Sequence, residues 1–144
     1  IFGSRGLGDV YKRQGFGFMT NPFNPYSGLV TVRADIIGET GKRIIRLAID
    51  TGATRTAISA DLLQSLGCKL TSGMSAEVIT GSRRETIQFT QLKSISVLGV
   101  RIEAFPVLAH NLPDGINVDG LLGLDFFRQR KLSLDFINGL VELN

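Results

Sequence analysis

The sequence predicts an all-β domain, a small closed barrel with one or two short helices. Short apolar segments with alternating polar residues outnumber the helical segments, and turn residues separate them at regular intervals. The chain contains 17 Gly and 9 Phe but no Trp, which suits strands and turns better than a helical bundle. Its 144 residues, 43% of them hydrophobic, are enough to bury one core without metals or disulfides.

The first part of the chain differs in composition from the rest. Residues 1–27 are rich in Gly, Phe, Asn and Pro and follow neither a strand period nor a helix period. We expect a leader or disordered arm there, partly foreign to the native protein, with Met19 as a plausible start. The folded domain is predicted over residues 28–144.

The first half of this domain begins with two strands and a helix. Apolar residues alternate with polar ones over 30–36, a turn follows at 38–41, and a second strand over 43–49 leads to Asp50. Ser59 is expected to cap a short helix over 60–66, which Gly67 ends.

The second half is predicted as strand pairs separated by glycine-containing turns. Strands are expected over 75–80 and 85–92 around an exposed tip at 81–84, and over 94–98 and 101–108 around Gly99. A loop at 111–117 and the segment 120–123 precede a helix over 125–130. The last strands, 132–136 and 140–143, form a hairpin on a two-residue turn, Asn138–Gly139.

Charge and hydropathy argue against nucleic-acid and membrane partners. The formal net charge is +3, but the basic pairs are scattered and no aromatic residues lie between them to stack bases. No apolar run is long enough for a membrane span, and no signal-peptide pattern opens the chain. The cellular location stays open.

Cysteine and histidine contribute little chemistry. The single cysteine, Cys68, excludes an intramolecular disulfide and is expected to be a small buried apolar residue. The single histidine, His110, lies in a polar loop and is expected at the surface. One His, one Cys and dispersed carboxylates offer no metal-ligand spacing, so neither a metal nor another cofactor is predicted.

Asp50 is the carboxylate with the most informative surroundings. An apolar strand delivers it to a turn that continues with Thr51, Gly52 and Ala53. Such a turn can hold a carboxylate among backbone N–H groups while leaving room for a substrate. Asp-Thr-Gly triplets also occur in simple turns, so this motif alone does not indicate catalysis. The second motif of the chain, Asp119–Phe126, makes the interpretation more specific.

Together the two motifs resemble the retropepsin-like aspartic proteases, in particular bacterial single-domain members whose second motif reads Asp-Gly-Leu-Leu-Gly-x-Asp-Phe. The resemblance extends over 28–144 and implies a small acid-protease barrel. It also implies that Asp50 is catalytic, that Thr51 and Gly52 complete its motif, and that Ala53 leaves space for a peptide. Thr80, Gly81 and Ser82 would form a flap over that peptide.

The resemblance has one clear departure. Viral members usually place an acidic residue after the Asp-Thr-Gly-Ala run and an arginine after the second glycine, forming an ion pair. The corresponding positions here hold Thr54 and Leu124. Residues 121–123 are expected to pack beneath the catalytic turn as support.

Peptide hydrolysis without a metal or a covalent nucleophile needs a base for water and an acid for the carbonyl, and two neighbouring carboxylates that share one proton supply both. No second Asp-Thr-Gly exists; Asp114 and Asp119 lack the hydroxyl residue, and we interpret Asp125 as a helix N-cap and Asp135 as an outward strand residue. The simplest answer is a homodimer in which Asp50 of each chain meets at the two-fold axis. Alternatives are a catalytically silent peptide-binding or assembly module on the same fold, and a regulatory sensor domain of a longer protein.

Overall fold

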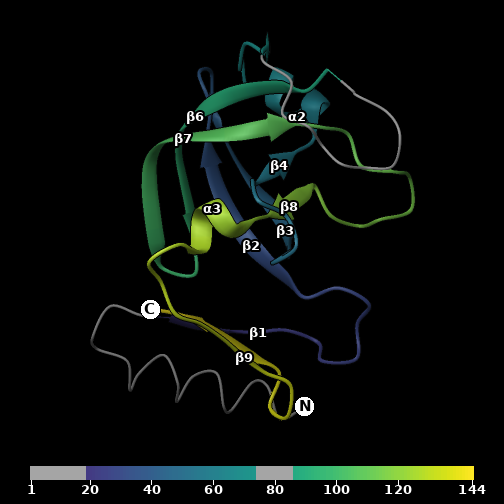
Figure 1. Ribbon diagram of the computed structural model, residues 1–144, viewed down its shortest axis with the longest axis vertical. Helices are drawn as coiled ribbons and strands as arrows, with labels where there is room; N and C mark the ends of the chain where they lie inside the picture. The colour runs from purple at the N-terminus through teal and green to yellow at the C-terminus, as the bar shows by residue number, and fades with distance from the viewer. Residues whose placement is uncertain (1–18, 74–85) are drawn as a thin grey trace.

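The structure is a computed structural model that describes residues 19–73 and 86–144, and Figure 1 shows its fold. Its strands are β1 (Met19–Pro22), β2 (Thr31–Ile37), β3 (Lys42–Ile49), β4 (Ala57–Ile58), β5 (Thr71–Ser72), β6 (Gln88–Val97), β7 (Val100–Ala109), β8 (Gly120–Leu122), β9 (Leu132–Asp135) and β10 (Leu140–Leu143). The two helices are short, α2 (Ala60–Ser65) and α3 (Leu124–Phe127). The predicted all-β class is confirmed.

Six strands close into a barrel in the order β2-β3-β8-β4-β7-β6, because β2 also pairs with β6; β5 extends the sheet beyond β6. Most neighbours are antiparallel, but β3 pairs in parallel with β8 and β4 in parallel with β7. The parallel pairs join segments that are distant in sequence. They bring the end of β3 beside the end of β8.

The barrel interior is the hydrophobic core. In β2 the buried side chains are Val32, Ala34 and Ile36, the period-two pattern of a strand with one face inside. Fully buried side chains from the other elements fill the same core, among them Leu47, Ile58, Leu63, Leu92, Ile95, Leu122 and Phe126. Burial of each large apolar side chain stabilises the fold by about 1.5–3 kcal/mol.

Strands β6 and β7 bend together, and Figure 1 shows them curving round the barrel. In β6 the buried set changes from Thr90 and Leu92 to Ile95 and Val97, so the inward face switches between them. At the same level of β7, Ala104 has a left-handed backbone with φ of 52°. The bend lets one strand pair with β5 at its start and with β2 at its end. The sequence predicts two separate strands here, whereas the structure has one.

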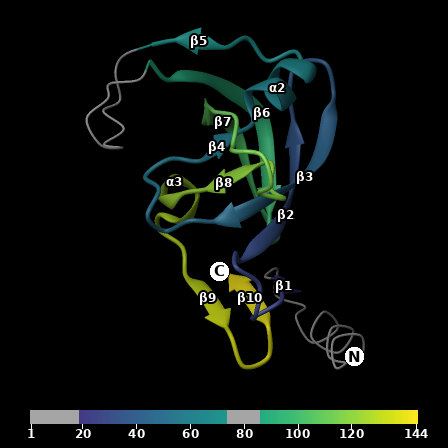
Figure 2. The same cartoon turned by 90° about the vertical axis from the view of Figure 1, so that its right-hand side faces the viewer.

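A second sheet of three strands, in the order β1-β10-β9, lies at one end of the barrel in both Figures 1 and 2. Residues 1–27 show no strand period, yet β1 pairs with β10 along its whole length. The rings of Phe23 and Phe136 pack edge to face here, with centroids 5.2 Å apart. The pairing partner of β1 is more than a hundred residues away, which explains why local sequence does not reveal the strand.

Ser59 caps α2 as predicted, since its side chain accepts a hydrogen bond from the Leu62 N–H. Helix α3 is shorter than the predicted 125–130, because Gln129 turns left-handed with φ of 65°. The last hairpin has a four-residue loop rather than a two-residue turn, since Leu140 pairs with Asp135.

The short strands β4, β5 and β8 are not predicted from sequence, and the predicted strand 75–80 lies outside the described residues. Within 19–73 and 86–144, neither helix has the length and hydropathy to span a membrane.

Candidate active site

Asp50 follows the last residue of β3 and lies beside the end of β8. Its N–H donates to the carbonyl of Leu122 at 3.0 Å, which continues the parallel ladder by one bond. Upstream, Leu47 and Ala48 are buried. The apolar strand therefore fixes the backbone from which the carboxylate projects.

The chain turns immediately after Asp50. The Ala53 N–H donates to the Asp50 carbonyl at 3.1 Å, and the Gly52 N–H donates to Asp50 Oδ1 at 2.9 Å. A Cβ at Gly52 would lie 3.2 Å from that carboxylate oxygen, so a larger residue would crowd it. Thr51 and Gly52 are exposed, and Asp50 and Ala53 are half-buried. The turn therefore orients the carboxylate and leaves its outer side open.

The segment after β8 supports this turn from behind. The Leu124 N–H donates to the Ala53 carbonyl at 2.8 Å, and the Asp125 N–H donates to the Thr54 carbonyl at 3.2 Å. A Cβ at Gly123 would lie 2.6 Å from the Arg55 carbonyl carbon and 2.8 Å from the Ala53 oxygen. Only glycine fits between the two segments.

One of two interpreted aspartates differs from its prediction: Asp125 is not the N-cap of α3, whereas Asp135 is a strand residue, the last of β9, as predicted. Gly123 occupies the N-cap of α3 and provides no side-chain cap, so the interpretation of Asp125 as an N-cap is wrong. Its carboxylate instead accepts hydrogen bonds from the backbone and hydroxyl of Thr56. Asp135 accepts three hydrogen bonds inside its own loop, from the Ile137 N–H and the Asn138 backbone and side chain.

Sequence reasoning did not identify Thr56 as a functional candidate. It is fully buried, and its bonds with Asp125 join residues 69 positions apart. A local pattern carries no signal for such a pair. The only signals are separate ones: a threonine just before an apolar strand, and an aspartate within the second motif.

The remaining candidates have clear positions where the chain is described. His110 is exposed, and its N–H donates to the carbonyl of Ile58. Cys68 is buried as expected, and desolvation raises the pKa of its thiol. Thr80, Gly81 and Ser82 lie outside the described residues. Among those described, no group of three or more His, Cys, Asp and Glu side chains could hold a metal ion.

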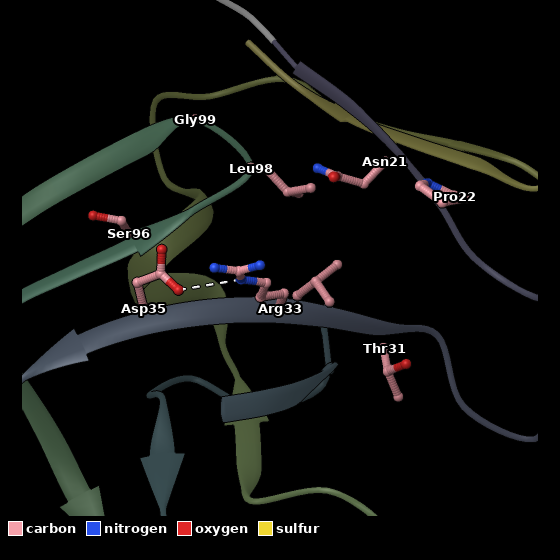
Figure 3. A pocket seen from close by; sticks show the side chains of 9 residues that line it. Asn21, Pro22, Thr31, Arg33, Asp35, Ser96, Leu98 and Gly99 are labelled. Atoms are coloured by element: carbon pink, nitrogen blue, oxygen red, sulfur yellow. Dashed lines mark hydrogen bonds and ion pairs between the residues drawn. The ribbon is translucent and has the colours of Figure 1, made fainter. Parts of the chain in front are cut away.

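Two open hollows, of about 610 and 560 Å³, lie on the outer face of the barrel and share Arg33, Asp35 and Ser96. Figure 3 shows the first of them between β1 and the barrel, with Arg33 and Asp35 paired at 3.3 Å. Neither hollow is lined by residues 50–53. The candidate site is thus a surface turn, separate from both.

Comparisons with known proteins agree with this geometry. Residues 32–126 match the family model for aspartyl protease, which covers more than half of the chain. The structure resembles a retropepsin-like aspartic protease from Rickettsia conorii (23% identity, TM-score 0.62, 89% of this chain and 90% of that one). It also resembles the EIAV protease complexed with the inhibitor HBY-793 (18% identity, TM-score 0.53, 75% and 92%). A search of curated proteins finds no match.

Proposed function

The chain belongs to the aspartyl protease family, and we propose that it is an endopeptidase whose dyad is formed by Asp50 from each protomer of a homodimer. The observation that carries the proposal is the Asp50 turn. Its carboxylate is held by the Gly52 N–H, and the turn opens to solvent at Thr51. This is the arrangement that a carboxylate needs to meet both a peptide and a second carboxylate.

The proposed second chain is supported by the hydrogen bonds and ion pairs of most of the other described aspartates. In the described part of the chain no hydrogen bond joins Asp50 to another carboxylate, and its carboxylate contact is with Gly52. Four other aspartates are engaged elsewhere, in bonds to side chains or backbone: Asp35, Asp119, Asp125 and Asp135. A symmetric dimer supplies the missing partner without moving any of them.

The proposed mechanism uses one shared proton. Two neighbouring carboxylates cannot both ionise comfortably, so in the proposed dyad one Asp50 is ionised and the other protonated. The ionised one removes a proton from water, which attacks the scissile carbonyl carbon, while the protonated one donates to the carbonyl oxygen. The Asp50 that took the proton from water then donates it to the amide nitrogen and the C–N bond breaks. The other Asp50 takes back a proton from a hydroxyl of the intermediate as the new carboxyl group forms.

Substrate binding is proposed around the open side of the turn. The small, half-buried Ala53 leaves room for an extended peptide backbone next to Asp50. Thr80, Gly81 and Ser82 are proposed to cover that peptide. The exposed Thr51 is proposed to reach the partner's turn and lock the two together.

The second sheet supports an association between copies. Strand β9 pairs on one side, with β10, so its other edge is free within the described fold. Beside it Phe136 and Ile137 are 54% and 92% exposed. Apolar side chains next to an unpaired edge favour burial against a second protomer.

One experiment tests the proposal. The full chain, its Asp50→Asn variant and an Asp114→Asn control are assayed on a peptide library from acid to neutral pH, with sedimentation to measure the oligomeric state. We expect cleavage by the wild type and the control, loss of cleavage in Asp50→Asn, and dimers in all three. Cleavage by Asp50→Asn at the wild-type rate would exclude the proposed dyad, and an active monomer would exclude its sharing between chains. Peptide binding without cleavage would instead favour the silent module.

A further inference from the structure

A buried polar link joins the catalytic turn to the second motif. Thr56 is fully buried and donates to the Asp125 carboxylate twice, from its N–H at 3.0 Å and from its hydroxyl at 2.7 Å. The Gly123 N–H in turn donates to the Thr56 hydroxyl oxygen at 3.1 Å. The hydroxyl thus donates to one partner and accepts from another, which leaves it a single orientation.

This link lies at one end of the catalytic turn, and a backbone bond lies at the other. At the upstream end, the Asp50 N–H donates to the Leu122 carbonyl. At the downstream end, Thr56 hydrogen-bonds to Asp125, and the Thr56 carbonyl accepts from the Leu108 N–H at 2.9 Å. The turn is therefore bonded at both ends, in addition to the backbone hydrogen bonds that Ala53 and Thr54 accept from Leu124 and Asp125 between those ends. Among the described residues, Thr56 and Asp125 are the only side chains that hydrogen-bond to each other across these two segments.

We propose that Thr56 and Asp125 are positioning residues for Asp50, an inference that rests on the proposed function. Two carboxylates can share a proton only when their oxygens lie within hydrogen-bond distance, so a small displacement of each turn separates them. The uncharged Thr54 and Leu124 form no ion pair between the segments. The short bond from Thr56 to the Asp125 carboxylate, which is stronger than one between neutral groups, takes the place of that ion pair. It sets the position of the turn together with the backbone bonds to Ala53 and Thr54.

The test compares side chains of matched shape in the full chain. Thr56→Val keeps the shape of Thr56 and removes its hydroxyl, whereas Thr56→Ser keeps the hydroxyl. Asp125→Ala removes the acceptor. Asp119→Ala is the structural control, because Asp119 accepts a backbone N–H from Arg46 at 2.9 Å at the opposite end of the β3–β8 pair. Steady-state kinetics are measured well below the melting temperature of every variant.

We expect kcat to fall roughly 100-fold in Thr56→Val and Asp125→Ala, the loss typical of a misplaced reacting group, with KM nearly unchanged. Thr56→Ser should keep kcat within about two-fold of wild type, since it keeps the hydroxyl and its hydrogen bond to Asp125. Asp119→Ala should lower the melting temperature but leave kcat unchanged. An equal loss of kcat in Asp119→Ala would overturn the inference, because the effect would then be general destabilisation.

A second readout separates this inference from the proposed function. If the wild type cleaves no peptide, the proposed function fails, and hydrogen exchange of the Gly52 and Ala53 amides then decides the inference. Faster exchange of these two amides in Thr56→Val than in Asp119→Ala supports positioning of the turn. Equal exchange in the two variants overturns it.

Discussion

At the scale of single residues, the Asp50 turn depends on how closely two backbone segments approach. Gly123 and Gly52 both lie where a side chain would touch atoms of this turn, and the contacts at Gly123 are with backbone rather than with flexible side chains. Neither glycine is needed for a left-handed backbone, because neither has a positive φ. Their role is to leave space.

Gly123→Ala is expected to destabilise the protein by about 1–3 kcal/mol, the usual cost of overpacking, because its Cβ would meet the Arg55 backbone at 2.6 Å. Urea unfolding followed by circular dichroism measures the change. Gly28→Ala is the matched control, since a Cβ there meets nothing within 4 Å. Equal stabilities of the two variants would show that the segments separate without cost.

At the scale of elements, two irregular features shape the strands: the bend in β6 and β7, and the loop between β9 and β10. Ala104 lies in the bend with a left-handed backbone, which L-residues other than glycine rarely adopt. Asp135 holds the loop by accepting hydrogen bonds from Ile137 and Asn138. Each feature gives a prediction about stability.

Ala104→Gly is expected to stabilise the protein by about 1 kcal/mol. Glycine removes the steric cost of the left-handed backbone, and this gain exceeds the additional backbone entropy that glycine loses on folding. Thermal unfolding measures the change. Ala57→Gly, in a strand position without positive φ, should instead destabilise. A loss of stability in Ala104→Gly would show that the bend does not strain this residue.

The hydrogen bonds to the Asp135 carboxylate make part of the free energy of unfolding depend on pH. Hydrogen bonds from the Asn138 side chain, and then from its backbone, hold the pKa of Asp135 below its ordinary value. The native state therefore binds this proton less tightly than the unfolded chain does. The contribution is present above the unfolded pKa of about 3.9 and is lost as pH falls through the lower native pKa.

Asp135→Asn should therefore lower the urea midpoint at neutral pH, and the difference from wild type should shrink as the pH falls below about 4. Asp114→Asn, a change in an exposed loop, is the control and should leave the midpoint unchanged at both pH values. A difference for Asp135→Asn that stays constant with pH would argue against the hydrogen-bonded carboxylate.

At the scale of the whole molecule, barrel closure is what assembles the candidate site. The parallel pairing of β3 with β8 places Asp50 beside Leu122, although the two are far apart in sequence. The barrel therefore builds the Asp50 turn together with its support. In the proposed dyad, the second copy of the turn comes from a second barrel.

If the homodimer has one shared site, a mixed dimer of one wild-type and one Asp50→Asn subunit should be inactive. Adding an equal amount of Asp50→Asn protein to the wild type, with time to exchange subunits, should reduce the activity by about half, because random exchange puts half of the wild-type subunits into mixed dimers. Dilution of the wild type alone should lower its specific activity. Activity that is unchanged by the variant would mean that each chain works alone.

The sequence by itself determined the features that depend on neighbours along the chain. It predicted the all-β class, the Ser59 cap and the strand that delivers Asp50 to its turn, because period-two burial, capping and turn chemistry are local. The tertiary structure alone decided the pairing of β1 with β10, the short strands β4 and β8, and the bonds between Thr56 and Asp125. These contacts join segments that are distant in sequence, and their energy exists only after the barrel closes, so no local pattern records them.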